Sequence, residues 1–149
     1  MNFEKLTIKS QEAVSGALEL ARRSGNPEVY PEHLTLALLD QELPRTLVGD
    51  AAAVRAEADA ALSAKPSISG AQQQPTTSAA LSRVLDRAFD EARELGDDYV
   101  SVEHLLLALD LVPRKELLER INEVRGSQRV TSQDPEGTYQ ALQLSLIHI

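Results

Sequence analysis

The sequence has 149 residues and 42% hydrophobic content, which is enough apolar material to bury the core of one ordinary domain. Its 15 basic and 23 acidic residues give a net charge of −8, which argues against nucleic acid as a partner because a phosphate backbone needs clustered lysine and arginine. Aromatic residues make up only 3% and cysteine is absent, so we expect an aliphatic core of packed helices without disulfides, in a reducing cytoplasmic compartment.

The first 64 residues predict amphipathic helices separated by short breaks. Apolar residues at helical spacing predict a helix over residues 8–24. Pro31 fits the first turn of a second helix, PEHLTLALLD, which is apolar on most sides and should be buried. Pro44 and Gly49 are expected to break the chain around a short apolar piece, before an alanine-rich helix over residues 51–64.

The second half begins with a connector and returns to helices. Residues 65–77 read KPSISGAQQQPTT, a composition that suits an exposed linker. Apolar residues from 81 to 95 follow helical spacing closely, and Gly96 ends the run. A second helix that should be buried begins at Ser101, and Pro113 begins a last one. Because no stretch alternates in the manner of a strand, we expect an all-α fold.

An internal repeat is the strongest signal in the sequence. Adding 71 to each position from Thr7 to Leu39 gives identical residues at 11 of the 33 positions, without a gap. Two copies of a helix-loop-helix unit predict a pseudo-twofold bundle, in which the junction between the copies is the natural groove. The second copy is shorter after its buried helix and is expected to lack a short third helix.

The repeated dipeptides Glu32-His33 and Glu103-His104 are the residues that hint most at a chemical site. A zinc helix would need a second histidine four residues on, and those positions hold Ala37 and Ala108. A structural role in the first turn of a helix is therefore favoured, with glutamate facing the helix dipole and histidine bonding the backbone.

Other polar residues also indicate structure rather than catalysis. Thr7, Ser78 and Ser101 each stand before a helical run and are expected to be N-caps. The acidic stretch at 86–98 lacks the order of a calcium loop and should be a solvated face. The seven glycines form no nucleotide-phosphate loop, and no segment is apolar enough to span a membrane. We expect no catalytic residue, no metal and no enzyme activity.

Four strings resemble the double Clp repeat domain at the N-terminus of ClpB-type AAA+ disaggregases: MNFEKLTIKSQEAVSGALELARRSG, PEHLTLALLDQ, VSVEHLLLALD and VRGSQRVTSQDPEGTYQAL. The last string is similar to the connector that leads into the first ATPase module. The resemblance implies a first repeat at 1–64, a linker at 65–77, a shortened second repeat at 78–126, and a connector at 127–143 toward a missing ATPase module. Residues 144–149, LSLIHI, resemble a translated sequencing adapter and are expected to be a non-native tail.

The resemblance also implies a function, namely binding unfolded or aggregated polypeptides for transfer to the ATPase rings. The family's substrate-contact positions correspond to Thr7, Asp97 and Glu103, and Leu85 would line the apolar groove. No cofactor is implied for this part of the chain, since ATP and magnesium belong to the full-length parent. Hexamers would form only through its ATPase modules, and neither nucleic acid nor membrane is an expected partner. The alternative is a free-standing Clp-repeat adaptor or modulator of a Clp chaperone or protease.

Overall fold

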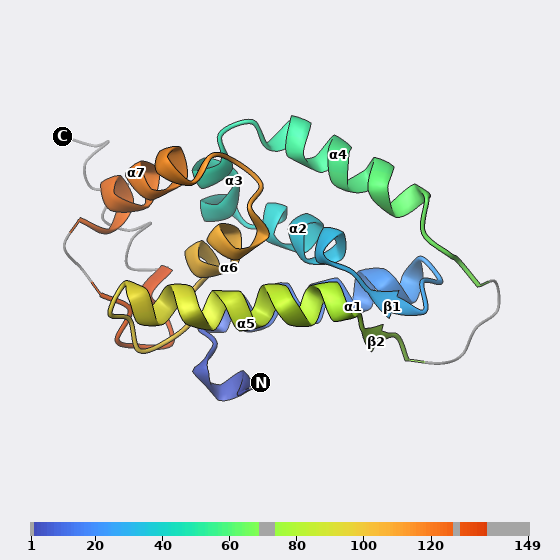
Figure 1. Ribbon diagram of the computed structural model, residues 1–149, viewed down its shortest axis with the longest axis horizontal. Helices are drawn as coiled ribbons and strands as arrows, with labels where there is room; N and C mark the ends of the chain where they lie inside the picture. Colours follow the sequence, from blue (N-terminus) through green and yellow to red (C-terminus); the bar gives the residue numbers. More distant parts are fainter. Residues whose placement is uncertain (1, 69–73, 127–128, 137–149) are drawn as a thin grey trace.

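The computed structural model describes residues 2–68, 74–126 and 129–136, and their fold is helical as expected (Figure 1). The expected tail at 144–149 and the final part of the connector, 137–143, lie outside the described residues.

The first half contains a 3₁₀ turn η1 (Phe3–Lys5), strand β1 (Glu28–Val29) and four α-helices: α1 (Ile8–Arg23), α2 (Pro31–Leu39), α3 (Glu42–Val48) and α4 (Ala51–Ser63). The second half contains strand β2 (Thr76–Thr77), α5 (Ala79–Glu94), α6 (Val102–Leu109) and α7 (Arg114–Arg125).

The predicted repeat is present in the backbone, because α1 and α5 have the same length and begin and end at positions 71 residues apart. Their N-caps are also equivalent, with Thr7 accepting from the Ser10 N–H and Ser78 from the Leu81 N–H. Both helices stop at glycines with a φ of 73°, Gly25 and Gly96, which confirms the predicted ends.

Two short parallel pairings join the copies, and the sequence did not predict them. Val29 of β1 pairs with Thr77 of β2, and Leu6 forms an isolated bridge with Val100. Adding 71 to Leu6 and Val29 gives Thr77 and Val100, so the two pairings are equivalent to each other. Each joins a residue before the amphipathic helix of one copy to a residue before the buried helix of the other. Two residues are too few to produce an alternating pattern, so these strands could not be predicted from periodicity.

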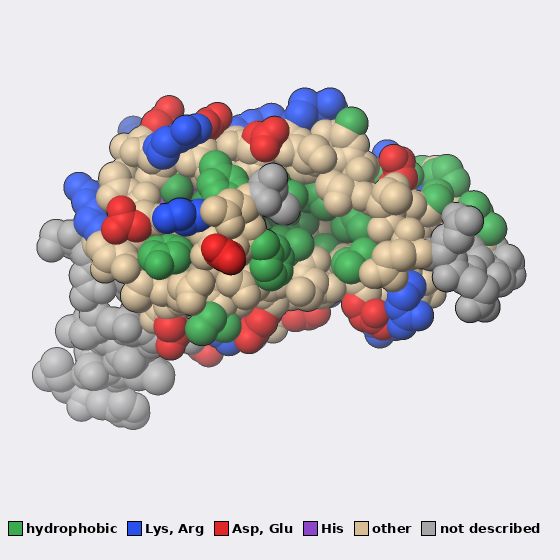
Figure 2. Space-filling view, turned by 90° about the horizontal axis from the view of Figure 1, so that it is seen from below, with side chains coloured by type: hydrophobic (Ala, Val, Ile, Leu, Met, Phe, Trp, Pro, Cys, Tyr) green, Lys and Arg blue, Asp and Glu red, His purple; other side chains and the backbone are tan. Residues whose placement is uncertain are grey.

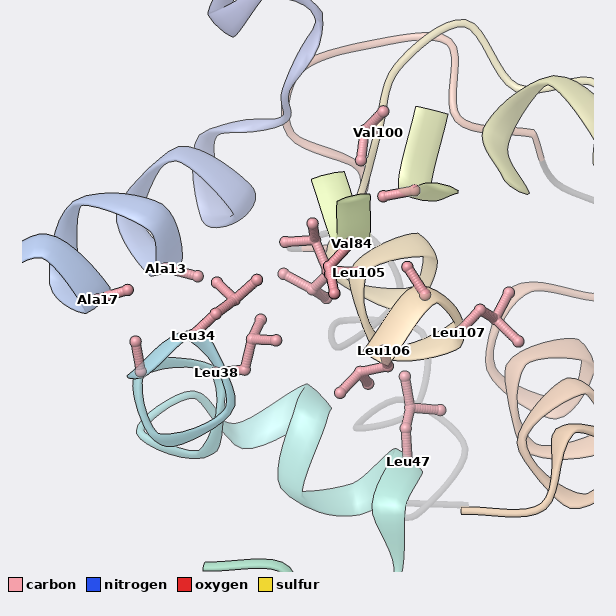
Figure 3. Close-up of a cluster of buried hydrophobic side chains, with 14 of the residues drawn as sticks. Ala13, Ala17, Leu34, Leu38, Leu47, Val84, Val100, Leu105, Leu106 and Leu107 are labelled. Carbon is pink, nitrogen blue, oxygen red and sulfur yellow. The ribbon is translucent and has the colours of Figure 1, made fainter. Parts of the chain in front are cut away.

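The core lies where α2 and α6 meet, as the close-up in Figure 3 shows. Leu34 and Leu38 of α2 and Leu105 and Leu106 of α6 have no exposed surface. Helix α1 packs on α2, and α5 packs on α6, so each repeat covers its own buried helix with an amphipathic one.

Helix α3 differs from the broken segment expected around Pro44. The proline occupies the first turn of the helix, where a backbone N–H has no partner within the helix, so it is tolerated there. Leu47 of α3 is buried and lies beside Leu106 in Figure 3.

The second repeat has no counterpart of α3, as its length predicted. Helix α6 ends at Leu109 and α7 begins at Arg114 after a left-handed residue, Asp110. Helix α7 packs against α3 of the first repeat instead, where Arg120 donates to the Leu47 carbonyl oxygen at 2.9 Å. The asymmetric copies are thus linked by a contact between repeats.

Candidate functional site

An apolar groove of about 280 Å³ lies at the junction between the two copies. Hydrophobic side chains gather near the middle of the face shown in Figure 2, which views the molecule from below. Val14 of α1 and Leu85 of α5 are equivalent repeat positions, and both line the groove. Its other apolar lining residues are Phe3, Ala17, Leu18, Val29, Leu34 and Leu81.

The groove has a recessed floor and an exposed rim. Leu34 and Leu85 are buried in its floor, whereas Phe3 is 42% exposed at its edge. Because the lining is mainly aliphatic, the groove can accept apolar side chains but offers few hydrogen bonds to fix one particular ligand. Leu85, which the sequence placed in an inter-repeat groove, lies there.

The two repeated histidines act inside the fold, as expected. Nδ1 of His33 accepts from the Tyr30 N–H at 2.9 Å, and Nδ1 of His104 accepts from the Ser101 N–H at 2.8 Å. An amide can only donate, so in each ring Nε2 carries the proton and donates to a second partner. That partner is Asn26 for His33 and Asp97 for His104. Burial lowers the pKa of His33.

Asp97 is the centre of a buried polar cluster in the second repeat. It accepts from Nε2 of His104 at 2.7 Å, from the Arg125 guanidinium at 2.5 Å and from the Val130 N–H at 2.9 Å. Burial opposes ionisation of the carboxyl, but the hydrogen bonds from His104 and Arg125 outweigh it and hold the pKa of Asp97 well below its usual range. Asp97 is therefore a buried anion that ties α7 to the loop before α6.

Glu103 lies on the other side of Arg125 and is 1% exposed. Its nearer oxygen is 3.6 Å from Nε of Arg125, which is an ion-pair distance without a hydrogen bond, and neither carboxylate oxygen has a hydrogen-bond partner. A buried carboxylate in this state is costly, because one guanidinium is shared between two acids.

Thr7 is fully buried at the start of α1 and contacts a residue that the sequence did not single out. Its hydroxyl donates to Oε2 of Glu136 at 2.7 Å, and the same oxygen accepts from the Val102 N–H at 3.2 Å. Glu136 is 1% exposed, and its other oxygen has no hydrogen-bond partner. Two helix N-termini, those of α1 and α6, thus converge on one carboxyl group.

The four site residues expected from the sequence separate into two places. Leu85 lies in the apolar groove, whereas Asp97 and Glu103 share Arg125. Thr7 bonds Glu136, which also accepts from the N–H of Val102, the residue before Glu103. No periodicity or motif distinguishes Arg125 and Glu136 in the sequence. Their roles come from contacts with residues 22 or more positions away along the chain.

Within the described residues, no group of three histidine, aspartate or glutamate side chains is arranged to hold a metal ion. Among the same residues, no helix combines the length and the apolar character that crossing a membrane requires.

Comparison with known proteins identifies the family to which the chain belongs. Residues 5–119 match the Clp repeat (R) N-terminal domain family. The chaperone protein ClpB of Nitratidesulfovibrio vulgaris is 41% identical over 167 residues, a match that covers 96% of this chain and 19% of the relative. The chain therefore spans about a fifth of that relative's length.

Solved structures share the fold. The N-terminal domain of Hsp104 from Candida albicans superposes with a TM-score of 0.75 at 25% identity, covering 87% of this chain and 97% of that one. A complex of the ClpV N-domain with a VipB peptide has a TM-score of 0.57 at 24% identity, covering 80% of this chain and 82% of that chain.

Proposed function

The chain belongs to the Clp repeat (R) N-terminal domain family of ClpB- and Hsp104-type chaperones, and we propose that it binds unfolded or aggregated polypeptide through the apolar groove between α1 and α5. The groove itself is the observation that carries the proposal, because aliphatic side chains from both repeats line it at one place. Short hydrophobic stretches, which folded proteins bury and unfolded ones expose, are the segments that such a surface selects.

The size of the groove favours weak binding. Burying one leucine-sized side chain contributes about 1.5–3 kcal/mol, and a groove of this volume holds two or three of them. Association costs at least about 4 kcal/mol of free energy, because the partners lose translational and rotational freedom, so the net affinity should be modest. Weak binding suits a domain that must release each segment.

The wider context in the whole protein is also part of the proposal. We propose that a bound segment passes to ATP-driven rings in a cytoplasmic, hexameric parent, and that this domain itself catalyses no reaction. The repeats would span 1–64 and 78–126, joined by 65–77, with 127–143 leading toward the ATPase module. The net charge of −8 favours polypeptides with basic flanks.

The test is binding of a permanently unfolded probe, reduced lactalbumin whose thiols are blocked as uncharged carbamidomethyl groups, measured by calorimetry. Phe3→Ser at the exposed rim should weaken binding about three- to tenfold without unfolding the protein, and Leu85→Ser in the floor should weaken it more. Ile68→Ser is the matched control, because Ile68 is 52% exposed and lies outside the groove. Equal binding by all three variants and the unmodified chain would rule out the groove.

A further inference from the structure

After α7 the chain returns across the domain, and we call residues 129–136 the cover segment. Its backbone is bonded to both repeats: the Ile8 N–H donates to the Gln133 carbonyl, and the Asp98 N–H donates to the Val130 carbonyl, each at 2.8 Å. The Gln133 side chain donates to the Glu4 carbonyl at 3.1 Å. The cover segment therefore lies over the N-terminal end of α1 and the loop before α6.

Glu136 is the last residue of the cover segment, and its side chain covers Thr7. Its carboxyl group reaches the two helix N-termini described above, and Thr7 has no exposed surface while Glu136 lies there. Thr7, a position expected to contact substrate, is thus occupied by the chain itself.

The charges around Glu136 favour a proton on its carboxyl group. Glu103 raises the pKa of Glu136 by its negative charge, and Arg125, the cation beside Glu103, is shared with Asp97. The ring of His104 faces away from this carboxyl group, since its Nδ1 bonds the Ser101 N–H and its Nε2 bonds Asp97.

A polar cavity of about 540 Å³ adjoins Glu136 on its other side. The charged residues that line it from α1, the end of α2 and α3 are Lys9, Glu12, Asp40, Glu42 and Arg45. Three acids and two bases leave no positive excess there, so this side does not offset the repulsion from Glu103.

Burial, with a smaller contribution from Glu103, raises the pKa of Glu136 to about 7, against the opposing hydrogen bond from Thr7. When the segment is released into water, the carboxyl returns to its ordinary pKa of 4.5. Docking is therefore favoured most fully below pH 4.5, and this contribution is lost as the pH rises through about 7.

We propose that the cover segment is an intramolecular competitor, held by Glu136 as a proton-sensitive latch, and that polypeptide reaches Thr7 and the N-terminal ends of α1 and α6 only after its release. The competition with bound polypeptide rests on the proposed function, whereas the latch does not. The competitor's own contacts define the surface: main-chain N–H groups of Ile8, Asp98 and Val102, and one hydroxyl, offered to an extended chain.

Amide hydrogen exchange of the full chain tests the latch. The Ile8 amide is the reporter, because it is bonded to the Gln133 carbonyl rather than to Glu136 itself. Glu136→Ala should lower its protection factor at pH 6 at least tenfold, whereas Glu123→Ala, at an exposed site on α7, should leave it unchanged. The Leu81 amide, bonded to Ser78, is the internal reference.

The proton link has its own variant. Glu136→Gln keeps a carbonyl oxygen for Thr7 and Val102 but carries no charge. Protection of the Ile8 amide should fall at least tenfold between pH 5 and pH 7.5 in the unmodified chain and stay constant in Glu136→Gln. If the protection factor of the Ile8 amide is unchanged in Glu136→Ala, the latch is ruled out. If that protection factor does not depend on pH in the unmodified chain, the link to protonation is ruled out.

Binding of the unfolded probe then tests the competition. Glu136→Ala should bind it at least threefold more tightly than Glu136→Gln. Release of the segment without any gain in binding, while Phe3→Ser still weakens binding, would show that the cover segment does not compete with polypeptide. Binding in the apolar groove would remain supported. If neither the unmodified chain nor any variant binds the probe, the proposed function and the competition both fail. The hydrogen-exchange results then still test whether Glu136 holds the cover segment in place.

Discussion

His33 in the first repeat donates to an amide, Asn26, whereas the equivalent His104 in the second donates to a carboxylate, Asp97. The amide has donors of its own, and Asn26 uses one on the Pro66 carbonyl nearby at 2.8 Å. The carboxylate can only accept, so it gathers donors from elsewhere, namely Arg125 and the Val130 N–H.

The difference shows how one exchange within a repeat alters its role in the fold. The first repeat has α3 to complete its packing, and its histidine cap stays local. The second repeat lacks that helix, and Asp97 instead ties α7 and the cover segment to α6. The neutral partner of the histidine in the first repeat, Asn26, is thus replaced in the shortened second repeat by a charged one, Asp97, which bonds several elements.

Removing the two histidine partners should give the largest contrast between the repeats. Asp97→Ala removes a buried carboxylate that accepts from His104, Arg125 and the Val130 N–H, and should lower the free energy of unfolding by about 3–5 kcal/mol. Asn26→Ala leaves only neutral groups unpaired and should cost about 1–3 kcal/mol. Urea denaturation measures both, and equal losses would contradict the contrast.

Asp97→Asn makes the second repeat resemble the first and tests the charge itself. Because the pKa of Asp97 is lowered in the folded chain, its stabilisation is fully present well above 3.8, its ordinary value, and is lost as the pH falls below it. Urea midpoints of the unmodified chain and Asp97→Asn should therefore differ at pH 5 and converge toward pH 2. A constant gap would show that the carboxylate charge is not the cause.

The N-caps should give the smallest contrast. Ser78→Ala removes one cap and should cost about 1 kcal/mol. Thr7→Ala removes the equivalent cap together with the hydroxyl that holds Glu136, and should cost about 2 kcal/mol. Thermal unfolding compares the two, and in Glu136→Ala the extra cost of Thr7→Ala should disappear.

Local signals explain why most helices could be predicted. Thr7, Ser78, Gly25 and Gly96 fix the ends of α1 and α5 through contacts or dihedral angles within a few residues, so their chemistry can be recognised from the chain alone. Helix α3 was missed because Pro44 was interpreted as a break, although a first helical turn accepts proline.

The site could be predicted only in part. The inter-repeat groove followed from the repeat, because two copies related by an approximate twofold axis leave a junction between them, whereas the place of Leu85 was implied by the family resemblance. The enclosure of Thr7 by Glu136 could not be predicted, since 129 positions separate these residues along the chain.

The chain alone predicted the all-α class, the two copies offset by 71, the shortened second copy and the capping role of the histidines. Each of these follows from spacing or from contacts within one turn of helix. The packed helices were needed to show that Asp97 and Glu103 share Arg125 and that the cover segment lies over Thr7. Those contacts join residues far apart in sequence, and burial, which sets their charge states, exists only once the helices have packed.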